Sequence, residues 1–444
     1  MSGPALPDGR FATDRETVDA HRLDRSGWVP AGRPLGVALA ASVADVRAVL
    51  RHASATGTPV VVRGAGTGLS GAAAATDGSI VLDVSRLNRI TEISVADQLA
   101  VVEPGVITAD LDRAAAAHGL RYAPDPASAA ISTIGGNIAT NAGGLRCAKY
   151  GVTRDSVLSL DVVLADGEVI STGHRTVKNV TGYDLTGLFT GSEGTLGVIV
   201  GATVRLRPLP AGTATVAAWF DDIAAAAAAV TAIAAAGVQP AVAELLDAPT
   251  LAAVERITPG GPAAGAFLLV QTDGPAAATE ADQVLAVLGD RTARVFAARD
   301  DAEAEQLLAV RRQALPALER LGRVLIEDVA VPRSRLAEAV EEIQAISKRH
   351  AVPVFTMAHA ADGNLHPILV VDRDRELDDE VWAAADAIFT MALDLGGTLT
   401  GEHGVGVLKR TWLGNDLGER NLALQRRLRA VFDPAGILNP GKAV

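Results

Sequence analysis

Hydrophobic positions in the first half of the chain occur in short runs, separated by turns rich in glycine and polar residues. Short runs rich in β-branched residues predict strands at residues 59–63, 79–84, 158–164 and 197–206. Apolar residues at helical spacing predict helices at residues 14–22, 42–50 and 109–118. Asp166-Gly167 separates a strand from the polar segment that follows, and this dipeptide is typical of a hairpin turn.

The pattern changes after residue 210, where strands and helices alternate. The predicted strands are residues 216–220, 266–272, 324–331, 352–359 and 365–371. The predicted helices are residues 222–236, 276–288, 301–320, 335–350, 378–395 and 420–432. Asp362-Gly363 lies between two of these strands and predicts a second hairpin. Pro208 and Pro210 mark a domain boundary, because 444 residues are too many for one hydrophobic core.

Composition and charge exclude several classes of protein. Hydrophobic residues make up 49% and charged residues 21% of the chain, which is typical of a folded protein rather than a disordered one. The formal net charge of −12 argues against a nucleic-acid partner, since phosphate binding needs clustered lysine and arginine. Cys147 is the single cysteine, so the chain forms no internal disulfide and cannot hold a four-cysteine iron–sulfur cluster. We interpret Cys147 as a packing residue rather than a nucleophile.

The first residues have no apolar segment of the kind that forms a secretory signal. No apolar run approaches the roughly 18 residues that a membrane span requires. We therefore expect a cytoplasmic protein without a membrane span, with attachment to the inner face of the membrane left open.

A glycine-rich turn follows the strand at 59–63 and reads RGAGTGLSG over residues 63–71. Its glycine spacing also fits the dinucleotide fingerprint of an NAD-binding Rossmann protein, and Asp83 lies near the position of a ribose-binding acid. The segment before the next strand is too short for the crossover helix of that fold. The turn can still surround a pyrophosphate, because glycines let backbone N–H groups approach closely. A tight turn without a ligand remains the alternative.

A second segment, residues 124–151, has little periodic pattern and is rich in glycine, asparagine and threonine. Within it, residues 135–144 read GGNIATNAGG, a poor core sequence but a suitable one for enclosing a large planar cofactor. An aperiodic stretch of this length inside a compact domain is usually functional. We expect irregular backbone here, with a third flexible segment, GSEGTLG, at residues 191–197.

Taken in order, RGAGTGLSG, PDPAS, TIGGNIATNAGG, KYG, KNVTGYDL and GSEGTLGVI resemble the FAD domain of the vanillyl-alcohol oxidase/p-cresol methylhydroxylase superfamily. Within it, the chain is similar to the FAD-linked D-2-hydroxy-acid dehydrogenases, which include D-lactate dehydrogenases and glycolate oxidase catalytic subunits. The resemblance implies an α+β fold. It divides the chain into an N-terminal arm (1–29), a PCMH-type FAD-binding domain of two α/β subdomains (30–210), a cap with an antiparallel sheet and helices (211–400), and a C-terminal segment that packs back on the FAD domain (401–444).

The same resemblance implies which residues surround the FAD. They are Arg63, Gly64, Ala65, Gly66, Thr67, Gly68, Ser70, Pro124, Gly135, Gly136, Asn137, Thr140, Asn141, Gly143, Gly144, Tyr150, Glu193, Ile199 and Asn439. Some relatives attach the flavin covalently through histidine or cysteine. Residues 63–71 contain no histidine, and Cys147 matches no such position, so non-covalent FAD is expected. For Asn439, in the closing motif DPAGILNPGK, a surface turn is the alternative interpretation.

Two motifs in the second half contain side chains that can bind a metal ion. Residues 359–366 read HAADGNLH, and the turn at Asp362-Gly363 lets its two histidines face one point. Residues 398–406 read TLTGEHGVG and add a carboxylate and a third imidazole. Two histidines, one carboxylate and an open position make a catalytic metal site. Separately hydrogen-bonded polar residues are the alternative.

Both motifs resemble C-terminal signatures of the family. The resemblance implies His359, His366 and Glu402 as ligands of a divalent metal, zinc by preference, with His403 as the catalytic base. It also implies substrate contacts from Arg311, Asn364 and Lys409, with an exposed helix arginine as the alternative for Arg311. The chain departs from the family by placing Ala358 and Ala361 where glycine is usual, and alanine is strained at a positive φ.

These parts predict a reaction. The metal binds the hydroxyl and carboxylate of a 2-hydroxy acid, and His403 takes the hydroxyl proton. The C2 hydride passes to flavin N5 and leaves a 2-keto acid and reduced FAD. Relatives that act on dicarboxylates tend to carry a basic residue in the strand that here reads VLIEDVAVP, so Ile326 favours a monocarboxylate.

Two other functions stay open at this point. One is a sugar-alcohol or aryl-alcohol oxidase on the same flavin domain, although a neutral alcohol needs no metal. The other is a flavin-binding subunit of a complex without activity of its own, although such subunits are expected to lack the histidine–glutamate motifs. Oxygen, a quinone, an electron-transfer flavoprotein and an iron–sulfur subunit are all compatible electron acceptors, and a homodimer is left open.

Overall fold

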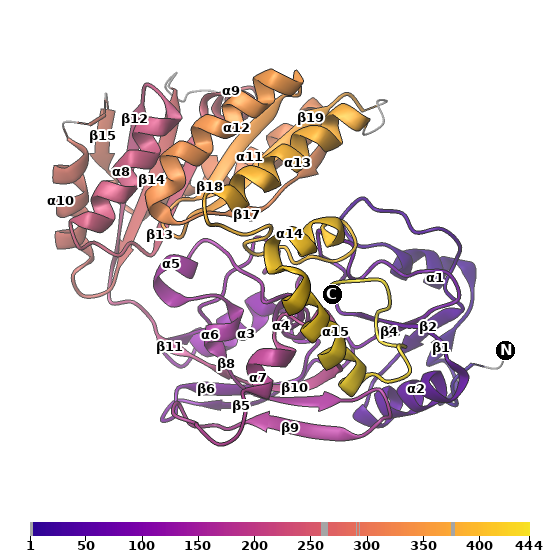
Figure 1. Ribbon diagram of the computed structural model, residues 1–444. Coiled ribbons are helices and arrows are strands. Elements are labelled where there is room, and N and C mark those ends of the chain that lie inside the picture. Colours follow the sequence, from indigo (N-terminus) through magenta and orange to yellow (C-terminus); the bar gives the residue numbers. More distant parts are fainter. Residues whose placement is uncertain (1–2, 259–264, 290, 293, 374–377) are drawn as a thin grey trace. The chain divides into compact units, whose positions relative to one another are not determined.

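The computed structural model describes residues 3–258, 265–289, 291–292, 294–373 and 378–444. The chain divides into two compact units, shown with their elements in Figure 1. Unit 1 consists of Met1–Gly144, Gly151–Leu209 and Glu402–Val444, and unit 2 of Leu145–Tyr150 and Pro210–Gly401. The short segment Leu145–Tyr150 thus belongs to unit 2, although residues on both sides of it belong to unit 1.

The first sheet of unit 1 has the strand order β1-β2-β4-β3. Its strands are β1 (Phe11–Ala12), β2 (Gly36–Leu39), β3 (Val60–Arg63) and β4 (Ile80–Asp83). Strands β2 and β3 pair with β4 in parallel. Helix α1 (Arg15–Arg22) begins at the cap Asp14, and α2 (Val43–Thr56) runs from the cap Ser42 to Gly57, whose φ of 67° is the left-handed geometry that glycine adopts freely.

The connection from β3 to β4 explains why the Rossmann interpretation fails. Residues 64–79 are all described, and none of them is helical. Two parallel strands are therefore joined by a glycine-rich loop instead of a crossover helix, as the short spacing predicted.

The second sheet of unit 1 is antiparallel, in the order β5-β6-β10-β8-β9. Its strands are β5 (Ile90–Ser94), β6 (Leu99–Val102), β8 (Val157–Val163), β9 (Val169–Gly173) and β10 (Val198–Arg205). The hairpin expected at Asp166-Gly167 is confirmed between β8 and β9. Around this sheet lie α3 (Thr108–Ala116), α6 (Thr153–Ser156), α7 (Leu185–Phe189) and the paired short strands β7 (Leu120–Arg121) and β11 (Arg207–Pro208).

The expectation of irregular backbone across residues 124–151 is wrong. The segment contains α4 (Ile134–Thr140), and within unit 2 it contains α5 (Cys147–Tyr150). Helix α4 forms despite two glycines because the Thr133 side chain accepts a hydrogen bond from Gly136 N and Asn141 closes the helix in the left-handed conformation. Gly135 lies so close to Pro104 that an added Cβ would be 2.4 Å from the proline Cβ. Tertiary packing therefore overrides the low helix propensity of glycine.

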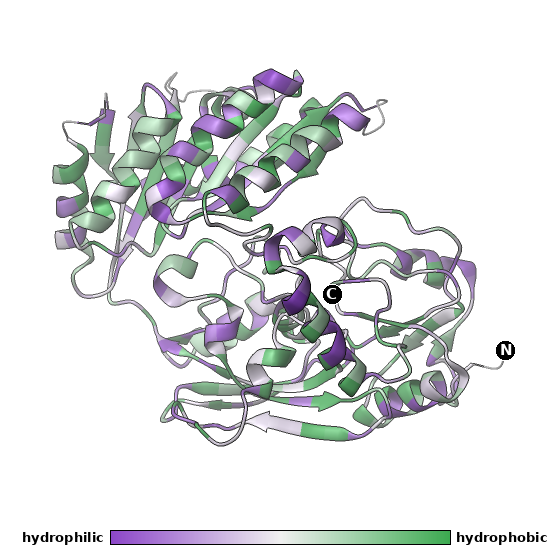
Figure 2. Ribbon diagram, viewed as in Figure 1, coloured by the Kyte–Doolittle hydropathy of each residue, from purple (hydrophilic) through white to green (hydrophobic). Residues whose placement is uncertain are grey.

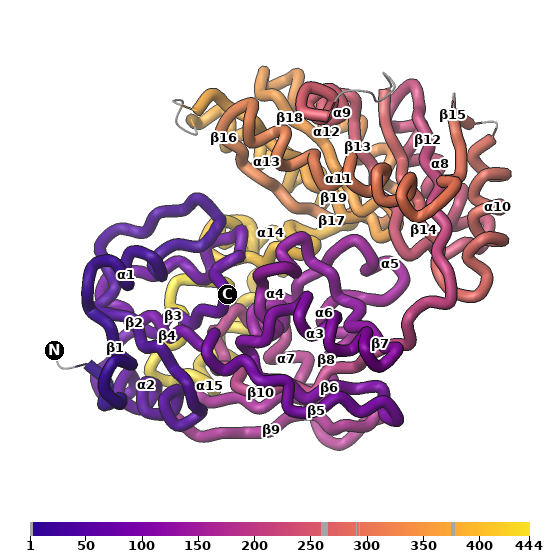
Figure 3. Tube along the Cα trace, turned by 180° about the vertical axis from the view of Figure 1, so that it is seen from behind, coloured from indigo at the N-terminus to yellow at the C-terminus, as the bar shows by residue number. Residues whose placement is uncertain are grey.

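The C-terminal segment of unit 1 contains α14 (Leu413–Leu417) and α15 (Glu419–Phe432). After α15 the chain returns to the first sheet, where Leu438 forms a parallel bridge with Val60. Figure 3 shows this yellow tail beside β3 and β4 of the same unit. The side chain of Asp433 accepts hydrogen bonds from the backbone of Ile437 and Leu438 and so fixes the return.

Unit 2 is built on an antiparallel sheet, which in its described part has eight strands in the order β15-β12-β14-β13-β18-β19-β16, with β17 also paired to β19. The strands are β12 (Thr213–Phe220), β13 (Val242–Asp247), β14 (Ala266–Asp273), β15 (Arg294–Ala297), β16 (Arg323–Ile326), β17 (Val329–Ala330), β18 (Val354–His359) and β19 (Asn364–Val371). The hairpin predicted at Asp362-Gly363 is confirmed between β18 and β19. The single strand predicted at 324–331 is interrupted at Glu327-Asp328.

The helices of unit 2 are α8 (Ile223–Ala235), α9 (Ala248–Glu255), α10 (Ala277–Leu288), α11 (Asp301–Leu321), α12 (Leu336–His350) and α13 (Asp379–Asp394). One core cluster joins α9 and α11 to alternate residues of the central strands, among them Leu246, Phe267, Met357 and Ile368. Figure 2 shows these strands as mainly hydrophobic. Since successive strand residues point to opposite faces, the cluster identifies the face of the sheet that α9 and α11 cover.

The α+β class expected from the sequence is confirmed by these mixed sheets and helices. Across the described residues, no helix combines the length and the apolar character that crossing a membrane demands.

The buried carboxyl of Asp247 makes the stability of the protein depend on pH. Its oxygens cap α9 through Thr250 N at 2.9 Å and bind Thr356 N at 2.8 Å, and burial raises its pKa to about 6. A raised pKa means that the folded state holds the proton more tightly than the unfolded chain does. The stability from this group, about 3 kcal/mol at most, is therefore present at low pH and lost as the pH rises through about 6.

As the pH falls from about 7 to about 4, we expect the thermal midpoint of the wild-type protein to rise relative to that of Asp247→Asn. The reason is that the amide of the variant does not titrate. Calorimetry of both proteins across this range measures the difference directly. A difference that stays constant with pH would contradict this account of Asp247.

Candidate active site

In unit 2, strand register brings together two of the three side chains predicted to bind metal, His359 and His366. Glu244 of β13 is the cross-strand partner of His359 of β18, and Met357 is the partner of His366 of β19. Residues 357 and 359 share one face of β18, which is the face that α9 and α11 cover. His359, His366 and Glu244 therefore point into the same buried layer.

The turn between the two histidines has the geometry that its sequence requires. Gly363 has a φ of 83°, and a Cβ added to it would be 2.1 Å from the carbonyl oxygen of Val331. Neither Ala358 nor Ala361 has a positive φ, and both are buried. The two alanines that replace the usual glycines thus cause no backbone strain.

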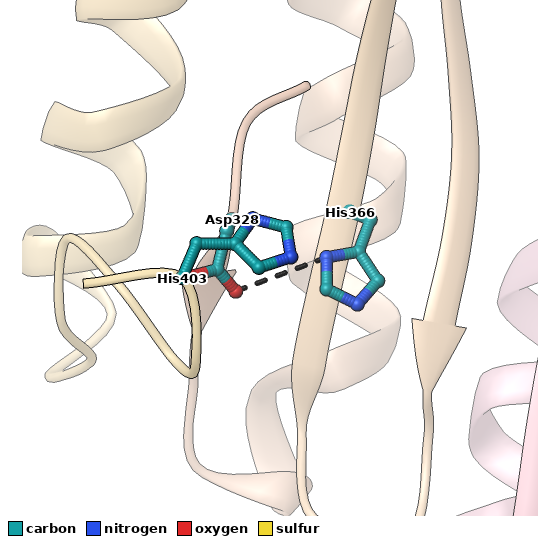
Figure 4. A group of neighbouring side chains, drawn as sticks. All are labelled: Asp328, His366 and His403. Atoms are coloured by element: carbon teal, nitrogen blue, oxygen red, sulfur yellow. Dashed lines mark ion pairs between the residues drawn. The ribbon is translucent and has the colours of Figure 1, made fainter. Parts of the chain in front are cut away.

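The two imidazoles are close and almost fully buried. Their ring centroids are 5.0 Å apart with the planes at 86°, and the side chains of His359 and His366 are 8% and 5% exposed. Each Nδ1 faces a buried carboxylate: Glu244 Oε1 lies 2.7 Å from that of His359, and Asp328 Oδ1 lies 3.8 Å from that of His366. Figure 4 shows the second pair with its ion pair dashed.

This donor set fits a divalent cation. Imidazole nitrogens and carboxylate oxygens are common zinc ligands, and metal-binding histidines usually give their second nitrogen to a carboxylate. Asn364, the cross-strand partner of His359, adds a buried amide oxygen that has no hydrogen-bond partner among the described residues. A buried acceptor of this kind is costly unless a ligand satisfies it.

Arg311, predicted to contact substrate, is engaged inside unit 2. Its Nε lies 2.5 Å from Glu244 Oε2, and its Nη1 is 3.6 Å from Met357 Sδ. The arginine side chain is 13% exposed and the glutamate is fully buried. At least one donor of Arg311 is therefore used to hold a carboxylate of the protein.

In unit 1, the glycine-rich loop after β3 leaves room only for glycine at two positions. A Cβ on Gly64 would lie 2.3 Å from Thr133 Oγ1, at the start of α4, and one on Gly66 would lie 2.1 Å from the Arg63 guanidinium. Arg63 itself is buried and donates from Nη1 to Leu23 O at 2.8 Å. Gly64, Gly66, Thr67 and Gly68 are partly exposed and Ala65 is exposed, so the loop offers accessible backbone next to a buried guanidinium.

The backbone around His403 is fixed by two residues of the same unit. Ser70 Oγ donates to His403 O at 3.0 Å, and the Glu193 carboxylate accepts from Val405 N and Gly406 N, both at 2.8 Å. A Cβ on Gly406 would be 2.0 Å from Ser70 O, so this close contact requires glycine.

Glu402 lies beside the second glycine-rich segment of unit 1. A Cβ on Gly143 would be 2.5 Å from Glu402 Oε2, and Glu402 Oε1 is 3.5 Å from His403 Nε2. The predicted carboxylate ligand, Glu402, and the predicted base, His403, are thus neighbours within this unit.

Glu193, predicted to contact FAD, binds the backbone of residues 405–406 with its carboxylate. Burial raises its pKa, while the N–H groups of Val405 and Gly406 and the charges of Lys409 and Lys442 favour the ionised form. Because both carboxylate oxygens accept from the 405–406 backbone, the side chain positions the loop that carries His403. Lys409, predicted to contact substrate, is buried near this carboxylate.

Several other residues predicted to bind FAD use their side chains in folding. Asn137 Nδ2 donates to Thr108 Oγ1 at 2.7 Å, Thr140 Oγ1 donates to Gly136 O, and Asn141 Oδ1 accepts from Arg154 N. Gly144 is in tight contact with the backbone of Asp125, and Pro124 and Ile199 are buried.

Tyr150 is assigned to unit 2, whereas the other predicted FAD contacts belong to unit 1. Its hydroxyl donates to Asp273 Oδ2 at 2.6 Å, and Lys149 Nζ binds Oδ1 of the same aspartate at 2.6 Å. The prediction for Tyr150 overlooked this long-range partner.

Asn439 and Lys442 bring the C-terminal tail to the loop at residues 72–74. Asn439 Nδ2 donates to Ala72 O and Glu193 O, and Lys442 Nζ donates to Ala72 O and Ala74 O. Burial lowers the pKa of Lys442 to about 8. Asn439 Oδ1 is buried without a hydrogen-bond partner among the described residues, which fits a donor supplied by a bound cofactor.

Sequence reasoning missed three buried charged residues, Glu244, Asp328 and Lys442, which are all 0% exposed. For the two carboxylates a signal was present in the sequence, since Glu244 lies in the apolar run VAELL and Asp328 in VLIEDVAV. A charge inside an apolar strand is rarely buried without a partner. The partners of Glu244, however, are distant in sequence and could not be named.

The chain is similar to known protein families, to curated proteins and to solved structures. A model of the C-terminal domain of FAD-linked oxidases matches residues 209–443, and an FAD-binding domain matches residues 34–173. Glycolate oxidase subunit GlcD of Bacillus subtilis is 45% identical over 406 residues, which cover 90% of this chain and 86% of the relative. A D-lactate dehydrogenase of Archaeoglobus fulgidus is 35% identical over 434 residues, 96% of each chain.

Among solved structures, p-cresol methylhydroxylase with substrate bound superposes with a TM-score of 0.78 at 19% identity, over 98% of this chain and 94% of that one. That likeness establishes the PCMH-type fold. The sequence matches also establish the family, since the model of the C-terminal domain covers more than half of the chain and both relatives cover most of it. The chain therefore belongs to the FAD-linked oxidases and is an FAD-linked oxidoreductase, with an FAD-binding domain followed by an FAD-linked oxidase C-terminal domain.

Proposed function

We propose that the protein oxidises a small 2-hydroxy acid of the D-lactate or glycolate type to the 2-keto acid. The observation that carries this proposal is the pair of buried histidines in unit 2, each with Nδ1 facing a buried carboxylate. A neutral alcohol gives no reason for such a cation site, whereas a hydroxy acid offers two oxygens to a metal. The names of the relatives, a glycolate oxidase subunit and a D-lactate dehydrogenase, support the same substrate class.

The proposal includes non-covalent FAD and a divalent metal, zinc by preference. Residues 63–71 of unit 1 and Asn439 would hold the FAD, and His359, His366 and Glu402 would bind the metal. When bound, the flavin supplies a two-electron acceptor, and the cation supplies a positive charge that makes the substrate hydroxyl more acidic.

His403 is the proposed base for the hydroxyl proton. An imidazole is suited to proton transfer near neutral pH. Ser70 and Glu193 fix the carbonyl of His403 and the backbone that follows it, so the ring starts from a defined main-chain position. General acid–base catalysis depends on such positioning, because the base must reach the proton at hydrogen-bond distance.

Substrate selection is assigned to Asn364, Lys409 and Arg311. The buried oxygen of Asn364 can accept a hydrogen bond from the substrate hydroxyl, and the two cations favour a carboxylate. Ile326 is on the same face of the sheet as the histidines and offers no charge to a second carboxylate. We therefore favour a monocarboxylate.

A separate electron acceptor completes the proposed cycle. The relative from Bacillus subtilis is named as a subunit, which supports a partner protein, such as an iron–sulfur subunit or an electron-transfer flavoprotein. The single cysteine agrees with an iron–sulfur centre carried by another chain.

The first experiment is anaerobic mixing of the yellow protein with D-lactate, L-lactate, glycolate and D-2-hydroxyglutarate while flavin absorbance is followed. We expect bleaching by D-lactate or glycolate, and loss of bleaching after metal chelation. His403→Ala should keep FAD but slow the bleaching by about 10²- to 10⁴-fold, the usual contribution of a general base.

His118→Ala, at an exposed position after α3, is the matched control and should react like wild type. A yellow protein that none of the four acids bleaches would reject the proposed substrate class. Rapid bleaching by His403→Ala would reject the role of His403 while leaving the substrate class intact.

Glu193→Gln separates two roles of Glu193. If the carboxylate positions the His403 loop, the amide loses one of two charge-assisted acceptors, which is worth about 1.5–3 kcal/mol. We then expect kcat to fall about ten- to a hundredfold with little change in FAD affinity. The measurements are steady-state rates and FAD titration of the apoprotein. Weaker FAD binding with an unchanged kcat would instead favour direct contact with the cofactor.

A further inference from the structure

We propose that Glu244 is a positioning residue for the metal ligand His359, and that Arg311 holds Glu244 in place. This inference rests on the metal site of the proposed function and deepens it. All three residues lie within unit 2, so their arrangement is internal to one compact body.

The sheet register sets up the first contact. Glu244 and His359 are directly opposed on the antiparallel strands β13 and β18, so their side chains leave the sheet side by side. His359 Nδ1 is 2.7 Å from Glu244 Oε1, a short hydrogen bond between an imidazole N–H and a carboxylate. This bond puts the proton on Nδ1 and makes Nε2 the nitrogen that can bind a metal.

Arg311 supplies the second contact. A fully buried carboxylate is unfavourable without a countercharge, and Arg311 Nε is 2.5 Å from Glu244 Oε2. The two oxygens of Glu244 are therefore divided, one to the histidine and one to the arginine. With both oxygens held, the carboxylate cannot turn, and the imidazole plane is fixed in turn.

The other histidine provides an internal comparison. Asp328 is equally buried and faces His366 Nδ1, but at 3.8 Å, which is beyond hydrogen-bond range. Its other oxygen accepts from Thr400 Oγ1 at 2.6 Å. Of these two histidine–carboxylate pairs, Glu244 and His359 are the pair at hydrogen-bond distance, so Glu244 is the carboxylate that the geometry assigns to ligand orientation.

The inference changes the expected role of Arg311. A residue that only bound substrate would alter KM and leave metal affinity unchanged. A residue that anchors Glu244 should also weaken metal binding when it is replaced. Arg311→Met should therefore lower zinc affinity in the protein without substrate, in the same direction as a change at Glu244.

The decisive experiment measures zinc affinity of the FAD-bound full chain, stripped of metal, by competition with a chromophoric chelator. Glu244→Gln removes the charge but keeps the size of the side chain. We expect its dissociation constant for zinc to rise about 10- to 100-fold, the usual effect of losing a carboxylate behind a metal-binding histidine. Absorption bands of bound Co²⁺ should also shift, because the imidazole is no longer oriented.

Asp247→Asn is the matched control, since it neutralises another buried carboxylate of the same strand that faces no histidine. It should bind zinc as wild type does. Glu244→Asp keeps the countercharge for Arg311 but retracts the carboxylate from His359, and it decides the question if Glu244→Gln does not fold. Zinc affinity equal to wild type in either Glu244 variant would overturn the inference.

The outcomes also separate this inference from the proposed function. Failure of the wild-type protein to bind zinc would remove the proposed metal site, and the role of Glu244 with it. Tight zinc binding by wild type and by the Glu244 variants alike would leave the proposed function standing and reject only the role of Glu244.

Discussion

The structure of unit 2 depends on satisfying charge inside an apolar sheet. Glu244 and Asp328 are fully buried, at positions where an isolated carboxylate would be strongly unfavourable. Arg311 and His359 surround the first, and Thr400 and His366 lie by the second. The antiparallel register makes this arrangement possible, because it opposes Glu244 to His359 and turns both toward the layer that α11 covers.

Unit 1 depends on close backbone contacts rather than on buried charge inside a sheet. Its glycine-rich loops approach one another more closely than any side chain would allow, as at Gly64 with Thr133 and Gly406 with Ser70. Glu193 and Lys442 then connect these loops through their backbone groups. A chain that must enclose a large cofactor and also fix a histidine needs few side chains and many defined backbone positions.

The FAD-linked oxidases share this fold with enzymes of other chemistry, as the likeness to p-cresol methylhydroxylase at 19% identity shows. Fold alone therefore leaves the substrate undecided. The feature on which the proposed substrate class rests lies in unit 2, where HAADGNLH places two imidazoles against buried carboxylates. This is why the proposed 2-hydroxy-acid chemistry is argued from unit 2, while the family and the FAD follow from the whole chain.

The sequence by itself determined several of the strands, among them β3, β4, β18 and β19, and also most helices, both hairpins and the absence of a Rossmann crossover, since these follow from local periodicity and turn residues. It did not predict β13, the strand that carries Glu244. The sequence also identified His359 and His366 as candidate metal ligands, because their seven-residue spacing around a glycine turn is a local feature. Only the tertiary structure decided that residues 134–140 are helical, that Tyr150 binds Asp273, and that Glu244 and Arg311 meet His359. These contacts join residues far apart in the chain, so their partners follow from strand register and packing, which one sequence does not specify.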